Sequence, residues 1–104
     1  MLAFYLLPDD AARPSAARLE ELPKAGELSA ADFELLQQQR IIESRLSPEQ
    51  DFRWSSGVTQ MKLQLLLHRH PQLRPNDVST AEQRLFVVLL NASAAEAGLL
   101  AIAD

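Results

Sequence analysis

Arg84-Leu85-Phe86-Val87-Val88-Leu89-Leu90 is the stretch that decides between two folds for this chain, because every residue after the arginine is apolar. Periodicity alone cannot distinguish a buried helix from a buried strand in such a run. Two flanking signals favour a helix over 80–97. Ser79 stands three residues before Glu82, which is the spacing of a capping box, and residues 92–97 are rich in alanine, the strongest helix former.

Helix starts can also be identified earlier in the chain. Ser29 precedes Asp32 at capping-box spacing and predicts a helix over 29–46. Ser55 can cap a second helix over 56–70. A shorter helix is predicted over 11–22, because a proline at position 14 favours a helix start and a proline at position 23 favours its end.

These segments predict an all-α fold, a small four-helix bundle-like domain covering residues 1–104. The composition agrees, because 19 leucines and 15 alanines stand against nine β-branched residues. The alternative is an α+β fold in which short strands at 2–7 and 84–90 pair with each other.

The apolar run Leu2–Leu7 has no basic residue before it and two aspartates soon after Pro8, so it lacks the pattern of a secretory signal. No apolar run approaches the roughly 20 residues that span a bilayer. The chain has no cysteine, which excludes disulfides and thiol chemistry. We therefore expect a cytoplasmic protein that does not enter a membrane.

More apolar helix faces are predicted than a small bundle can bury. In the helix over 29–46, Ala31 and Leu35 belong to a stripe expected to face the core, while Phe33 and Leu36 project from the opposite side. The next helix likewise has one stripe that includes Met61 and a second face. Surplus faces of this kind favour a partner protein, and homodimerisation is the simplest way to cover them. The candidate partner-binding residues are Phe33, Leu36, Arg40, Trp54, Leu63 and Leu67.

Charge is distributed unevenly along the chain. Residues 1–34 carry a net charge of −4, residues 35–76 carry +3, and residues 77–104 carry −3, which together give the net charge of −4. The acidic ends suggest a basic partner. A basic segment over 53–74 could alternatively serve a small DNA-binding transcriptional regulator, although an overall negative charge disfavours nucleic acid. Its phosphate contacts would come from Arg53, Lys62, Arg69 and Arg74.

Catalytic and metal-binding patterns are lacking. His68 and His70 lie on opposite sides of a helix, and with no thiolate in the chain they are too few for a zinc site. Three glycines cannot build a phosphate cradle, and no nucleophile motif occurs. We therefore expect no enzyme, no metal and no cofactor. The sequence predicts a non-catalytic protein-binding module, such as an assembly chaperone, a secretion-system adaptor or a toxin-neutralising immunity protein.

Overall fold

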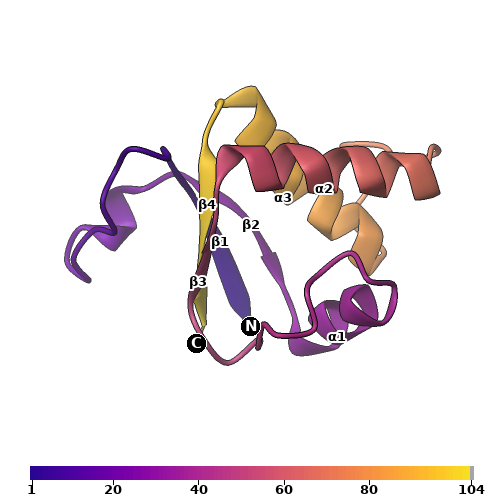
Figure 1. Cartoon of the computed structure of the whole chain (residues 1–104), viewed down its shortest axis with the longest axis horizontal. Helices are drawn as coiled ribbons and strands as arrows, with labels where there is room; N and C mark the ends of the chain where they lie inside the picture. The colour runs from indigo at the N-terminus through magenta and orange to yellow at the C-terminus, as the bar shows by residue number, and fades with distance from the viewer. Residues whose placement is uncertain (104) are drawn as a thin grey trace.

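An antiparallel sheet of four strands forms the centre of the fold in the computed structural model, which describes residues 1–103 (Figure 1). The strands are β1 (Leu2–Leu7), β2 (Lys24–Leu28), β3 (Phe52–Trp54) and β4 (Gly98–Ala103), in the spatial order β2-β1-β4-β3. The two central strands pair along their whole length, with Leu2 opposite Ala103 and Leu7 opposite Gly98.

All three α-helices lie on one side of this sheet (Figure 1). They are α1 (Ala30–Gln38), α2 (Ser56–Arg69) and α3 (Ala81–Ala94). The segment between β1 and β2 extends on the other side and holds the 3-10 helix η1 (Leu19–Glu21). Two layers therefore enclose the core, one of helices and one of strands.

The prediction of an all-α bundle is wrong, because the structure is α+β. The α+β alternative had the right class and the right strand at 2–7, but its second strand was misplaced. Residues 84–90 lie within helix α3, and β1 pairs instead with β4, which follows that helix. No element was predicted over 98–103. Leucine and alanine favour helix locally, but residues 98–101 are buried in a central strand, where tertiary packing outweighs that preference.

Helix boundaries follow the predicted caps more closely than the predicted lengths. Ser29 and Asp32 form the expected capping box, and Ser55 caps α2. The box before α3 is shifted by one residue, to Thr80 and Gln83. Where a helix was predicted over 11–22, only the single turn of η1 forms.

Helix α1 ends at Gln38, well short of the predicted residue 46, because the chain turns there. The amide of Arg40 donates to the carbonyl of Gln37 at 2.9 Å, and the amide of Ile41 donates to that of Leu36 at 3.0 Å. These two bonds form a Schellman motif, and Arg40 occupies its left-handed position with φ at 62°. Glycine usually fills this position, so the sequence contained no stop signal here.

The core between the layers contains an aromatic cluster surrounded by leucines. Phe4, Phe52 and Trp54 from the sheet pack in tilted and edge-to-face arrangements at centroid distances of 5.1–6.0 Å, and the ring of Phe33 in α1 lies 6.0 Å from that of Phe52. Gly26 allows α3 to approach β2, because a Cβ at this position would lie 2.6 Å from Cγ2 of Val88. This sheet supplies the covering that the predicted bundle lacked.

Candidate functional site

The loop that follows α1 is held in place by polar side chains from both sides. The side-chain amide of Gln37 donates to the backbone carbonyls of Glu43 and Leu46 at 3.0 and 2.8 Å. From α2, the ammonium of Lys62 donates to the carbonyl of Ile41 at 2.9 Å and forms an ion pair with Glu43. These contacts give residues 40–43 one defined position against α2.

Trp54 completes the support of this loop from the sheet. Its indole N–H donates to Glu43 at 3.3 Å, and the Lys62 ammonium lies 4.8 Å from its ring centroid. Lys62 is 7% exposed. Because a buried charge needs partners, the ion pair, the carbonyl and the aromatic face together account for its position. The three side chains therefore form one closed cluster beneath the loop.

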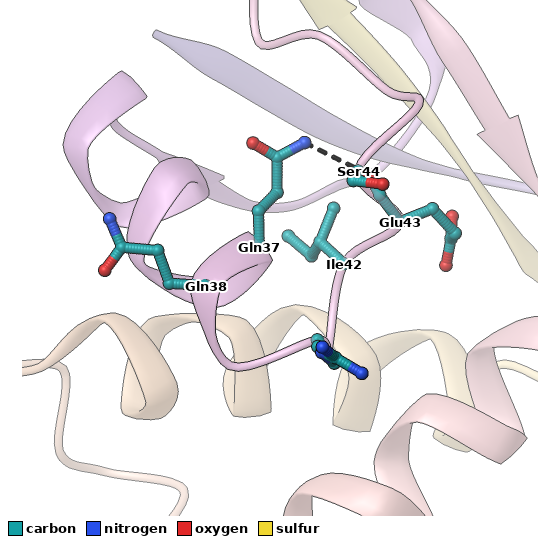
Figure 2. Close-up of a pocket in the computed structure, with 6 residues that line it drawn as sticks. Gln37, Gln38, Ile42, Glu43 and Ser44 are labelled. Carbon is teal, nitrogen blue, oxygen red and sulfur yellow. Dashed lines mark hydrogen bonds between the residues drawn. The ribbon is translucent and has the colours of Figure 1, made fainter.

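A hollow of about 500 Å³, to which mostly polar residue types contribute, lies on the α1 side of this loop (Figure 2). Gln37 points across it towards Ser44, while Gln38 projects from the same helix at its rim. Ile42 also lines the hollow and is itself buried. Arg40 also lines this hollow.

A second hollow of about 330 Å³ lies on the α2 side, and we name it the Arg40 groove. Met61 and Leu65 provide its apolar wall, and Met61 is 69% exposed. The groove is lined by Arg40, Ile41, Glu43, Met61, Lys62 and Leu65. Arg40 and Glu43 border both hollows, so the loop separates a surface of mixed polarity from a mainly apolar one.

The candidate partner-binding residues are divided between the core and the surface. Phe33, Leu36, Trp54 and Leu63 are buried in the folded chain, whereas Arg40 is exposed and Leu67 is 37% exposed. The expectation that Leu35 faces the core is wrong, because it is exposed and Phe33 and Leu36 belong to the buried core. The surplus of apolar faces disappears because the faces assigned to a partner are the ones that cover the sheet.

Helix α2 is likewise rotated relative to the predicted stripe. Its buried residues are Thr59, Lys62, Leu63 and Leu66, which leaves Met61 on the surface. The spacing of Thr59, Leu63 and Leu66 fits one helix face, and this was the available signal. Sequence reasoning did not identify Met61, Leu65 and Glu43 as groove residues. The orientation of α2 that exposes Met61 requires Lys62 on the buried face, and a buried lysine is not expected from sequence.

The four candidate nucleic-acid residues do not share a surface. Arg53 lies on the sheet face away from the helices and donates to the carbonyl of Pro8 at 2.6 Å. Lys62 is enclosed by the cluster with Glu43, and Arg69 donates to the carbonyl of Gln39. Arg74 stands in the loop after α2. A continuous row of phosphate contacts cannot be built from this arrangement.

The end of α2 is joined to the other helices through one glutamine. His70 Nε2 lies 3.3 Å from the side-chain oxygen of Gln39, and the side-chain amide nitrogen of Gln39 donates to the carboxylate of Glu82 at 2.5 Å. This hydrogen bond holds the pKa of Glu82 below its ordinary value. The glutamine therefore connects α2 to α3 at the end of α1, beside Arg40.

Residues 1–103 contain neither a metal-binding cluster nor a helix that could span a membrane. No group of three or more histidine, aspartate or glutamate side chains there could hold a metal ion. No helix in the same range is both long and apolar enough to cross a membrane. No protein-family model matches the sequence, and the comparisons with curated proteins and solved structures found no significant match.

Proposed function

We propose that this protein is a non-catalytic protein-binding module that contacts its partner through the Arg40 groove. The observation that carries the proposal is Met61, a large apolar side chain that is 69% exposed at the edge of a groove. Methionine is enriched at protein interfaces relative to the rest of the surface, so an exposed methionine on the wall of a groove favours a contact with a partner. Leu65 extends the same apolar wall.

The rigid support of the groove favours binding. Lys62, Glu43 and Trp54 hold the loop before any partner arrives, so little ordering of the loop is needed on association. The same contacts argue against chemistry at this place. The ammonium and the carboxylate neutralise each other, and neither is left free to move a proton or attack a substrate.

The protein would act by occlusion or scaffolding, covering one surface of its partner in the way an adaptor, an assembly chaperone or an immunity protein does. We place this interaction in the cytoplasm. A second copy of the chain would compete for the same groove, and self-association is therefore measured alongside binding. The apolar faces that suggested a homodimer are largely buried in the core of the chain itself. The proposal of a partner therefore rests on the exposed residues of the groove.

Site-specific photo-crosslinking in cells tests the proposal. A photo-reactive amino acid is placed at Met61 or, as the matched control, at Val78, which is a 55% exposed apolar residue outside the groove. We expect a discrete protein crosslink from position 61 that is absent from position 78. Equal yields from both positions, with the fold intact by circular dichroism, would contradict the proposal.

A further inference from the structure

We propose that the segment bound in the Arg40 groove is acidic and apolar, with a carboxylate that pairs with arginine beside an aliphatic side chain that contacts Met61 and Leu65. This inference rests on the proposed function and specifies the chemistry of the partner. It differs from the sequence-based expectation of a basic partner, which came from the acidic ends of the chain. The groove lies in the basic middle of the chain instead.

The charges around the groove do not cancel. Lys62 and Glu43 form an ion pair, which removes both from the balance. Glu82, the other carboxylate near this end, keeps its charge while it accepts the side-chain amide of Gln39, but it lines neither hollow. Within residues 1–103, the Arg40 guanidinium makes neither an ion pair nor a hydrogen bond. Arg40 therefore leaves an uncompensated positive charge that favours an anionic ligand group.

A second arginine strengthens this end of the groove. Arg69 is exposed and donates from Nη1 to the carbonyl of Gln39, the residue immediately before Arg40. It follows Met61 and Leu65 at intervals of four, so the three side chains lie along one side of α2. An apolar wall thus leads along the helix to a basic end. A segment that matches it carries an aliphatic residue and a carboxylate in the same order.

The backbone at Arg40 provides an independent observation. The left-handed region is unfavourable for a residue with a Cβ, and glycine would remove that cost at this position. The chain carries arginine there, at the junction of the two hollows. Glu96 adopts the same conformation after α3, with φ at 54°, but lines neither hollow. It therefore supplies a matched control for the backbone effect.

The crosslink from position 61 provides the test. The captured peptide is sequenced by tandem mass spectrometry, and the yield is compared between the parent, Arg40→Gly and Glu96→Gly. We expect an aspartate or glutamate within a few residues of the crosslinked position. We also expect the yield to fall about tenfold in Arg40→Gly, because a charge-assisted bond is lost, and to stay unchanged in Glu96→Gly.

Different outcomes overturn different statements. A crosslinked peptide that is neutral or basic, or a yield unaffected by Arg40→Gly, overturns the acidic ligand and leaves the protein-binding proposal standing. Crosslinking to nucleic acid overturns both, as does equal capture at positions 61 and 78. A crosslink to residues of the same chain, with concentration-dependent sedimentation, assigns the groove to a second copy and overturns the separate partner.

Discussion

The ion pair between Asp32 and Arg84 joins the first turn of α1 to α3, and its removal has a sharply defined consequence. Arg84 donates from Nε and Nη2 to the two carboxylate oxygens at 2.8 and 2.6 Å, and the amide of Ser29 donates to the same carboxylate at 3.2 Å. The Asp32→Asn substitution keeps the size of the side chain. It removes the counter-charge and turns an amide donor towards the guanidinium.

The magnitude follows from the burial of the two partners. Removing one member of a buried ion pair costs about 3–5 kcal/mol. The Asp32 side chain is buried, but that of Arg84 is 34% exposed and can recover some hydration. We therefore expect a lower cost, about 2 kcal/mol, for Asp32→Asn. In a chain of this length this corresponds to a fall in Tm of about 10 °C.

The cost also depends on pH. Hydrogen bonds from Arg84, followed by the amide of Ser29, hold the pKa of Asp32 below its ordinary value against the opposing effect of burial. A carboxyl with a lowered pKa in the folded state stabilises the fold above its unfolded pKa. That stabilisation is lost as the pH falls through the folded pKa. The difference between wild type and Asp32→Asn should therefore be largest at neutral pH and shrink below about pH 4.

Urea denaturation followed by the fluorescence of Trp54 measures this difference at neutral pH and again in acid. Asp77→Asn is the matched control, because the carboxylate of Asp77 has its pKa lowered by Ser79 in an exposed turn without an ion pair. It should shift the urea midpoint much less. Equal midpoints for the two variants at neutral pH, or a cost for Asp32→Asn that persists in acid, would refute the reasoning.

The remaining predictions concern backbone fit and the cluster beneath the groove. Gly26→Ala should cost about 2–4 kcal/mol in urea unfolding, since its Cβ would meet Val88 at 2.6 Å and its φ of +154° disfavours a side chain; a cost below 1 kcal/mol would contradict this. Arg40→Gly and Glu96→Gly should each raise the free energy of unfolding by about 0.5–1 kcal/mol, because glycine removes the cost of a left-handed backbone at these positions. A lower free energy of unfolding in both variants would show that neither residue is strained. Lys62→Met should cost about 1–3 kcal/mol and change the emission of Trp54, because Glu43 loses its counter-charge. Adding Glu43→Gln should recover part of that loss, and a strictly additive double variant would deny the coupling.

The sequence by itself determined the local features of this protein. The predicted helix over 56–70 corresponds to α2 and the one over 80–97 contains α3, because caps and propensity act within a few residues. The apolar run at 2–7 is a strand in the α+β alternative, and it forms the strand β1. The predicted cap at Ser29 is the N-cap of α1, because a capping box depends only on residues within one helical turn.

Only the tertiary structure decided which apolar faces point inward and which segments pair. Leucine and alanine favour helix locally, yet Gly98–Ala103 becomes a central strand because β1 and β3 supply its hydrogen bonds from distant parts of the chain. The sheet then draws Phe33 into the core and leaves Met61 on the surface. The Arg40 groove arises in the same way, because a buried Lys62 finds its partners only when the loop and α2 come together.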